Sequence, residues 1–343
     1  MKRVVSVLLA LVLVLATAQF VCAEENSMQY DKKTAEIRIR DPYILLEDGL
    51  YYMYGTGAAT GRGYGCYVSP DLENWAGPYN VFTADDSFIG VADFWAPECH
   101  KYGDKFYLFA TFRSRTTEHR GVGIFRADSP MGPFTLISDG AATPHDSDSI
   151  DGTLYVENGV PYMVYVQEWT TTDDGIGRMA VAQLSDDLTR FVTEPKEIFR
   201  ADTPRWADGE KVTDGPFVYR TKTGKLVMLW SNLSKQSYCV GMATADSITG
   251  EWTQCYSRLF RRGAGFKENG GHGMLFTDKN GQLALCMHSP NGTREDGTFE
   301  TATFLLVRDL GYTLALQDSR LSIGERILCL FDGVRAVFTK LFR

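Results

Sequence analysis

Short apolar stretches alternate with polar turns through most of the chain, and one arrangement of them recurs five times. Each copy holds an apolar stretch, a polar turn that contains glycine, and a second stretch rich in aromatic residues. The turn glycines are Gly49, Gly103, Gly159, Gly224 and Gly281, at spacings of 54, 56, 65 and 57 residues. Because Asp-Gly and Asn-Gly turns join the strands of β-hairpins, each copy predicts one hairpin.

A further strand follows most of these hairpins and ends in a small acidic turn with an aromatic residue. These turns lie at 67–75, 125–134, 182–191 and 242–252. Each repeat therefore holds about four strands, which is the content of one propeller blade. No sustained helical periodicity occurs between residues 30 and 320. We predict an all-β fold, a five-bladed β-propeller over 24–321, because a two-sheet sandwich would not explain repeats of this length.

The N-terminal end departs from the repeat. A basic start precedes an apolar stretch over 4–16, which is too short to span a membrane comfortably, and a small-residue cleavage site ends at Ala23. We predict a signal peptide over 1–23, export as a secreted or periplasmic protein, and no stable membrane span. Acylation of Cys22, as in a lipoprotein, is the alternative, and the bulky Val21 disfavours it.

The C-terminal segment, residues 322–343, carries the helical periodicity that the repeats lack. Its apolar residues fall on one stripe, and basic residues are distributed around that stripe. The stripe consists of Ile327, Phe331, Val334, Phe338 and Leu341, and the basic residues are Arg326, Arg335, Lys340 and Arg343. We predict a short amphipathic helix and expect it to pack on the propeller body. A membrane surface or a partner protein is the alternative.

Composition and charge narrow the class of partner. The chain has 343 residues, of which 44% are hydrophobic and 23% charged, and a net charge of −8 with no run of Lys or Arg. This composition argues against a nucleic-acid partner. Six cysteines follow Cys22, and no Cys-x-x-Cys pair suggests zinc. An oxidising compartment would permit disulfides, but we expect mostly buried free thiols.

The residue that opens each repeat is the candidate for chemistry. The innermost strand of a propeller blade lines the central channel. The opening positions hold Asp41, Ala96, Asp151, Asp214 and His272, at offsets of 8, 7, 8, 10 and 9 residues from the turn glycine. Similar offsets predict similar depth, so three carboxylates, with Glu98 just after Ala96 as a fourth, would meet a histidine. Each aspartate alone is typical of a turn, but a fold has no structural use for packing three carboxylates together.

Such a cluster suits hydrolysis of glycosidic bonds. One carboxyl must carry a proton for the leaving oxygen, another must be ionised, and a third can raise the pKa of the acid. Aromatic planes cover the apolar C–H faces of sugar rings. We predict substrate contacts for Trp95, Glu98 and Trp169. The other tryptophans, assigned to packing, are Trp75, Trp206, Trp230 and Trp252.

Together these motifs resemble glycoside hydrolase family 43, whose members are five-bladed propellers. The resemblance runs from about Arg38 to at least His288. The matching segments are Arg40-Asp41-Pro42, Trp95-Ala96-Pro97-Glu98, Ser149-Ile150-Asp151 and Gly270-Gly271-His272-Gly273. The resemblance implies that Asp41 is the general base and that Asp151 modulates the pKa of the acid. It also implies that His272 helps to hold a cation, often calcium. Because calcium prefers oxygen ligands, the histidine would act through ordered water or as one member of a mixed shell.

The general acid is where the sequence departs from the family pattern. The family usually has Glu before Gly-Pro, and here Asp214 precedes Gly215 and Pro216. The side chain is one methylene shorter, which reduces its reach by about 1.5 Å. We assign Asp214 as the acid. The alternatives are that Glu210 supplies the proton or that catalysis has been lost.

The resemblance implies an inverting enzyme that acts on arabinose or xylose linkages of plant polysaccharides. We expect an α-L-arabinofuranosidase that releases terminal pentose from side chains. The alternatives are a β-xylosidase or exo-galactosidase of the same family, or a catalytically silent sugar-binding propeller. A protein-interaction propeller explains less, because it needs no carboxylate cluster. The contacts that select the sugar are expected in the loops 170–178 and 289–298.

Overall fold

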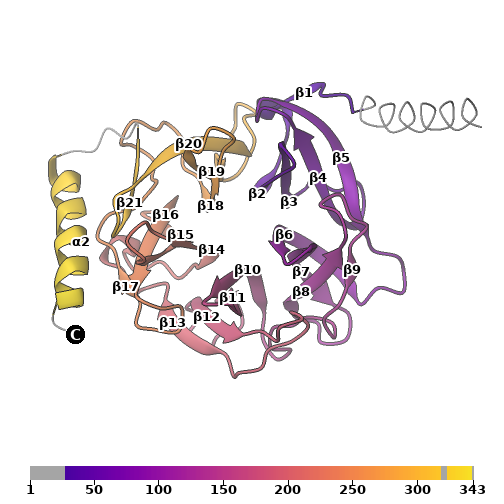
Figure 1. Cartoon of the computed structure of the whole chain (residues 1–343), viewed down its shortest axis with the longest axis horizontal. Helices are drawn as coiled ribbons and strands as arrows, with labels where there is room; N and C mark the ends of the chain where they lie inside the picture. The colour runs from indigo at the N-terminus through magenta and orange to yellow at the C-terminus, as the bar shows by residue number, and fades with distance from the viewer. Residues whose placement is uncertain (1–27, 318–322, 342–343) are drawn as a thin grey trace, which may run out of the picture.

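Strands form nearly all of the regular structure, and they build five sheets around a central axis (Figure 1). The computed structural model describes residues 28–317 and 323–341, so the predicted signal peptide over 1–23 lies outside the described residues. Four sheets have four strands each, and the first has a fifth strand at its outer edge. The predicted five-bladed β-propeller is confirmed.

Each blade is an antiparallel meander whose first full strand lies innermost (Figure 1). The first blade contains β2 (Arg40–Glu47), β3 (Leu50–Thr56), β4 (Gly63–Ser69) and β5 (Asn74–Thr83), with β1 (Lys32–Lys33) paired to β5. The second contains β6 (Gly90–Tyr102), β7 (Lys105–Ser114), β8 (Arg120–Ala127) and β9 (Thr135–Leu136). The third contains β10 (Ser149–Glu157), β11 (Val160–Gln167), β12 (Arg178–Gln183) and β13 (Lys196–Arg200). The fourth contains β14 (Asp214–Arg220), β15 (Leu226–Ser234), β16 (Ser237–Ala245) and β17 (Thr253–Gln254), and the fifth β18 (Gly271–Thr277), β19 (Leu283–Ser289), β20 (Thr301–Asp309) and β21 (Leu314–Leu316).

The five predicted hairpins are the pairs that begin the five blades. They are β2–β3, β6–β7, β10–β11, β14–β15 and β18–β19, all antiparallel. The first turn shows why glycine recurs there, because Gly49 has a φ of 76°, which glycine adopts without steric cost. The turn chemistry of the sequence therefore located the innermost strand of every blade.

The middle strands are buried on both faces, because each blade packs between two neighbours. In β7 every residue from Phe106 to Phe112 is buried, a continuous run rather than an alternation. The ring closes where the backbone N–H of Ile39 donates to the carbonyl oxygen of Glu300, 3.0 Å away, which joins the first blade to the last. Among the described residues the cysteines are free thiols, and all but Cys329 are buried, as predicted.

The predicted C-terminal helix is present as α2 (Ile323–Leu341), beside the outer rim of the ring (Figure 1). It packs on the propeller through Asp332, which accepts a hydrogen bond from the hydroxyl of Ser257, 2.6 Å away. The stripe residues Ile327, Phe331 and Val334 are exposed, so the helix does not bury its apolar face as expected for packing on the body. The side chains of the other two stripe residues are not described. Within 28–317 and 323–341, no helix is long and apolar enough to span a membrane.

Candidate active site

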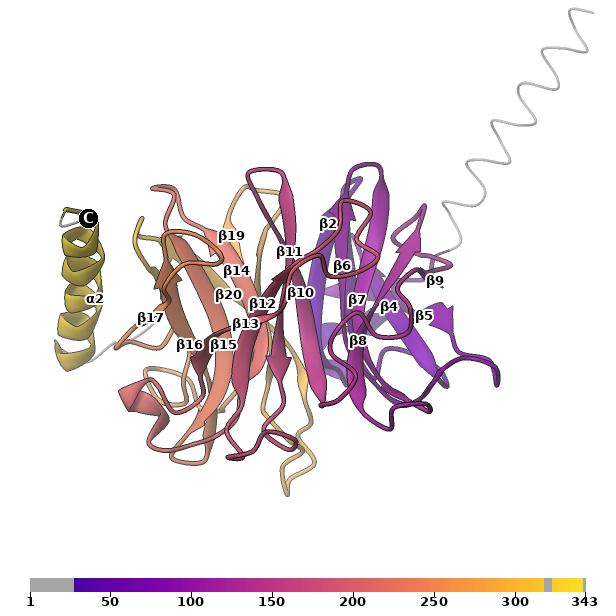
Figure 2. The same cartoon turned by 90° about the horizontal axis from the view of Figure 1, so that it is seen from below.

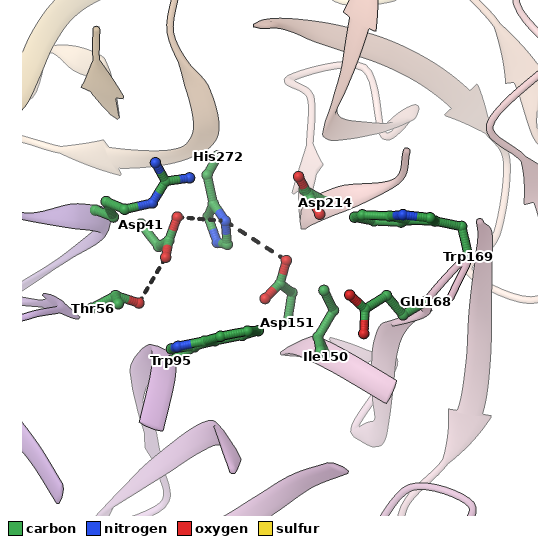
Figure 3. A pocket seen from close by; sticks show the side chains of 10 residues that line it. Asp41, Thr56, Trp95, Ile150, Asp151, Glu168, Trp169, Asp214 and His272 are labelled. Carbon is green, nitrogen blue, oxygen red and sulfur yellow. Dashed lines mark hydrogen bonds and ion pairs between the residues drawn. The ribbon is translucent and has the colours of Figure 1, made fainter. Parts of the chain in front are cut away.

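A cavity of about 450 Å³ lies at the centre of the ring, where the innermost strands begin (Figure 3). Its lining comes from all five blades and combines acidic, basic and aromatic side chains. The lining residues are Arg40, Asp41, Thr56, Trp95, Ile150, Asp151, Glu168, Trp169, Asp214 and His272. The structure thus brings together the predicted carboxylates, the predicted histidine and two of the three residues predicted to contact substrate.

A β-bulge lies in the innermost strand of every blade, at its start in four blades and within β6 in the second, and it directs side chains into the cavity. In each blade the pairing register shifts across two residues at this point. The first bulged residue has a left-handed backbone, with φ of 52° at Asp41, 42° at Ala96, 56° at Asp151, 47° at Gly215 and 52° at His272. Each non-glycine residue in this conformation costs roughly 1 kcal/mol or more. Strain of this kind, repeated around one cavity, is typical of a functional site.

The register places Asp214 one residue earlier than the sequence predicted. Gly215, and not Asp214, is the structural equivalent of Asp41. Asp214 instead corresponds to Trp95 and Ile150, the residues just before the bulge in their own blades. Because residues just before the bulge also line the cavity, Asp214 still reaches it. The larger offset of this aspartate from its turn glycine was the sign of this shift in the sequence.

Asp41 is held as a carboxylate. One oxygen, Oδ1, lies 3.2 Å from Nδ1 of His272, and the other accepts a hydrogen bond from the hydroxyl of Thr56 at 2.7 Å. Burial alone would raise the pKa of Asp41, but the charge and hydrogen bond of His272 outweigh it and hold that pKa well below its usual value. A carboxylate in this state can accept a proton but cannot donate one.

His288, which the sequence did not single out, holds the backbone of Asp41 in place through a hydrogen bond. The N–H of Asp41 donates to Nδ1 of His288 at 3.2 Å, and Nε2 of His288 lies 3.2 Å from Oδ1 of Asn291. A nitrogen that accepts a hydrogen bond carries no proton, so this ring is neutral. Burial agrees with this state, because it lowers the pKa of His288 to about 4. The 3.4 Å contact between His288 and the Asp41 carboxylate is therefore not an ion pair.

Asp214 and Asp151 form a pair that retains a proton near neutral pH. Burial, followed by the charge of Asp151, raises the pKa of Asp214 to about 7. Burial also raises the pKa of Asp151 to about 6, and His272 offsets only part of that effect. The hydroxyl of Tyr238 donates to Oδ2 of Asp214 at 2.9 Å, while the N–H of Gly215 donates to Oδ2 of Asp151 at 2.9 Å. Asp214 is therefore the carboxyl best placed to carry the proton.

At position 215 of this bulge the structure has room for glycine and not for a larger residue. A Cβ there would lie 2.7 Å from the ring of His272, and the φ of 47° disfavours any side chain. We expect Gly215→Ala to lower the free energy of unfolding by about 3 kcal/mol. Gly49→Ala is the matched control, because Gly49 also has positive φ but nothing lies within 4 Å of its Cβ position, and it should cost only about 1 kcal/mol. Urea unfolding measures both, and equal losses would contradict the predicted clash.

His272 lies between the carboxylates and balances their charge. Its Nδ1 is 3.2 Å from Asp41 and 3.7 Å from Asp151 (Figure 3). Although burial opposes it, the charges of Asp41 and Asp151 raise the pKa of His272 to about 10. The site thus holds one imidazolium ring among three carboxyl groups.

The residues around His272 show which kind of calcium contact this histidine could make. One ring nitrogen is engaged by Asp41, so only Nε2 is left for another partner. Among the described residues, no group of three or more His, Cys, Asp or Glu side chains has the geometry of a metal site. Calcium prefers a shell of oxygen ligands. The described residues therefore form no calcium cage of three or more such side chains, and a calcium ion here would meet His272 through ordered water or through Nε2 as one ligand of a mixed shell.

A second charged group, which the sequence did not reveal, contacts the lining residues Trp95 and Glu168. The guanidinium of Arg120 lies 4.8 Å from the centre of the Trp95 ring, and its NH1 is 2.6 Å from Oε2 of Glu168. Arg120 also pairs with Asp93 at 2.9 Å and with Asp148 at 3.0 Å. Burial raises the pKa of Glu168, and Arg120 opposes that shift. Arg120 therefore positions both an aromatic wall and an acidic wall of the cavity.

Glu98 and Glu210 lie outside the cavity. Glu98, for which we predicted a substrate contact, is buried two residues beyond the start of its bulge, and its carboxylate lies 3.0 Å from Nε2 of His100. That pairing explains why it does not reach the lining. Glu210, the alternative acid, is 3.4 Å from the backbone nitrogen of Gln236 and is not a lining residue either. These positions leave Asp214 as the candidate acid.

The chain is similar to several enzymes of known structure or activity. An endo-arabinase from Bacteroides thetaiotaomicron is 32% identical, with a TM-score of 0.73 over 82% of this chain and 98% of that one. An endo-1,4-beta-xylanase from the same organism is 28% identical, with a TM-score of 0.71 over 84% and 96%. The extracellular exo-alpha-(1->5)-L-arabinofuranosidase of Streptomyces avermitilis is 26% identical over 76% of this chain and 56% of that protein. The chain spans about half the length of several curated relatives, 56% and 55% in two of them.

The family model of Glycosyl hydrolases family 43 matches residues 30–307. This range begins just before the first blade and ends within β20 of the last. It includes every residue that lines the cavity. The chain therefore belongs to glycosyl hydrolases family 43.

Proposed function

We propose that the chain is an inverting glycoside hydrolase that releases terminal α-L-arabinofuranose from the side chains of plant polysaccharides. One observation carries the proposal: a single cavity holds Asp41, whose pKa His272 holds below its usual value, and Asp214, whose pKa burial and Asp151 raise to about 7. Inversion needs this division between a base and an acid. The relatives named as arabinofuranosidase and endo-arabinase support arabinose as the sugar.

Each carboxyl group takes one step of the reaction. Asp214 donates its proton to the glycosidic oxygen as the bond from that oxygen to the anomeric carbon breaks. Asp41 accepts a proton from the water that attacks the same carbon from the opposite face. Asp151 keeps the pKa of Asp214 raised and is itself held by the N–H of Gly215. Solvent then returns a proton to Asp214 and removes one from Asp41, which restores the starting state.

The cavity suits a terminal sugar better than the middle of a chain. Its volume of about 450 Å³ lies toward the small end of ligand pockets, which range over about 300–1,000 Å³. The rings of Trp95 and Trp169 border it as flat walls (Figure 3). Such walls can cover the apolar faces of one sugar ring while the carboxylates contact its polar edge. These features favour release of one residue at a time.

Screening aryl glycosides tests the sugar that the cavity accepts. We expect kcat/KM for an aryl α-L-arabinofuranoside to exceed that for the β-D-xyloside by at least about tenfold. The reverse preference would indicate a β-xylosidase, a possibility favoured by the likeness to the endo-1,4-beta-xylanase. Affinity for arabinose without turnover of any glycoside, arabinan or arabinoxylan would overturn the proposal in favour of a sugar-binding propeller.

We further propose that a hydrated calcium ion meets His272 through water at this cavity. The ion would supply positive charge near the pocket floor. Chelation and dialysis should then lower activity, and added Ca²⁺ should restore it while Mg²⁺ should not, because Mg²⁺ demands stricter octahedral geometry. Unchanged activity after chelation would exclude a functional calcium ion.

The N-terminal segment bears on where the protein acts. We propose that residues 1–23 are removed on export, which the extracellular location named for the Streptomyces avermitilis relative supports. Sequencing of the exported protein should then begin at Glu24. An acylated Cys22 at the N-terminus would instead identify a lipoprotein.

A further inference from the structure

Helix α2 carries a continuous exposed apolar face, whose one edge, at Phe331, borders a groove against the propeller. Ile323, Ile327, Leu330, Phe331 and Val334 are 79%, 44%, 64%, 57% and 51% exposed. Their spacing of three and four residues places them on one side of the helix. Single exposed apolar residues are normal on a protein surface, but a contiguous apolar face marks an interaction site.

The opposite side of α2 is fixed to the propeller. Asp332 is buried and accepts hydrogen bonds from the backbone nitrogen of Tyr256 at 2.8 Å and from the backbone nitrogen and hydroxyl of Ser257 at 3.1 and 2.6 Å. Gly333 lies against the ring of Tyr312, where a Cβ would approach within 2.4 Å. The helix cannot turn its apolar face inward without breaking these contacts, so the fold itself holds that face outward.

Basic residues border the apolar face. Arg326 and Arg335 of the helix are exposed, as is Arg205 of the neighbouring blade. Arg205 lines a groove of about 510 Å³ together with Trp206, Tyr256, Leu328 and Phe331. The segment 322–343 contains four basic and two acidic residues, in a chain whose net charge is −8. One of those acids, Asp332, is buried against the propeller and not presented with the arginines.

We propose that α2 holds the protein on an anionic lipid surface, with its apolar face in the headgroup region and its arginines beside lipid phosphates. A helix with a wide apolar face and basic flanks lies in the plane of a membrane surface, and each arginine adds attraction to anionic lipids. A second copy of this chain fits less well, because pairing two such faces would bring Arg326 and Arg335 of both copies together. The charge of the face therefore favours anionic lipid.

The cavity stays open in this arrangement. Helix α2 lies beside the outer rim and is inclined to the central axis of the propeller (Figures 1 and 2), whereas the cavity lies at the centre of the ring. A surface that covers α2 would therefore contact the side of the ring and not its open ends. Hydrolysis of a soluble aryl glycoside should proceed at the same rate on vesicles and in solution.

Binding to vesicles tests the proposal with the exported protein, so that every variant shares one N-terminus. Vesicles of phosphatidylcholine alone are compared with vesicles that also contain phosphatidylglycerol, and binding is followed by flotation. Leu330→Asp with Val334→Asp removes the apolar face, and Arg326→Gln with Arg335→Gln removes the basic flank. Val192→Asp is the matched control, because Val192 is a lone apolar residue of the third blade, 48% exposed.

We expect wild-type protein to bind the phosphatidylglycerol vesicles and each double variant to bind at least about tenfold more weakly. Val192→Asp should bind like wild type, and all variants should hydrolyse the aryl glycoside normally, which shows that they fold. Equal binding by Leu330→Asp/Val334→Asp would overturn the proposal. Absence of binding by the wild-type protein to the phosphatidylglycerol vesicles would overturn it too. If the wild-type protein then sediments as a dimer that Leu330→Asp/Val334→Asp dissociates, the occupant of the face is a second copy of the chain.

Discussion

Replacing Asp41 by alanine is expected to lower kcat by about 10³- to 10⁴-fold on every substrate, whatever its leaving group. Asp41 is the carboxylate that the structure keeps ionised, and without it no group accepts the proton of the attacking water. A better leaving group does not replace a missing base. Rates on p-nitrophenyl and 2,4-dinitrophenyl α-L-arabinofuranosides measure the effect, and both should fall alike.

The fold should survive this change. His272 keeps the carboxylate of Asp151 as a partner at 3.7 Å, so its charge is not left alone in the cavity. Asp104→Ala, at an exposed carboxylate in the turn between β6 and β7, is the matched control and should leave kcat unchanged. An Asp41→Ala protein that works within tenfold of the wild-type rate would show that another group is the base.

Replacing Asp214 by alanine is expected to give a loss that depends on the leaving group. On arabinan or an alkyl glycoside, whose leaving oxygen needs a proton, kcat should fall about 10²- to 10⁴-fold. On the 2,4-dinitrophenyl glycoside, whose oxygen leaves without a proton, the fall should be within about tenfold. The contrast with Asp41→Ala separates the acid from the base, because a merely damaged cavity would lose both activities.

The pH profile gives a second readout for Asp214. Its pKa is raised to about 7, and the protonated form is the one that acts. Wild-type activity should therefore be present below about pH 7 and decline as the pH rises through that value. Asp214→Ala acting on the dinitrophenyl glycoside should lack this decline. A variant that retained wild-type rates on arabinan would mean that Asp214 is not the acid.

The fold and much of the cavity follow from the chain pattern alone. Turn glycines such as Gly49 and Gly159 mark the hairpins, and the hairpins fix which residues begin the innermost strands. Asp41, Asp151 and His272 reach the cavity for that reason. Repetition made this possible, because equivalent residues of different blades occupy equivalent places around one axis.

The features that the sequence did not predict depend on contacts between positions that are not equivalent in the repeat. Arg120 begins β8, the third strand of the second blade. It reaches Trp95 and Glu168 only because the blades curve around the cavity. The offset of Asp214 from its turn glycine hinted at a different register, but only the strand pairing shows that Gly215 is the bulged residue of this blade. The stripe of α2 predicted an amphipathic helix, but the hydrogen bonds of Asp332 decide which side faces the propeller.

The anomeric form of the first sugar released tests the division of roles between Asp41 and Asp214 most directly. Proton NMR during early hydrolysis of an aryl α-L-arabinofuranoside resolves the two anomers before they interconvert. Attack by water activated at Asp41 predicts that β-L-arabinofuranose forms first. First appearance of the α anomer would contradict this mechanism, because it would require a covalent intermediate on one of the carboxylates.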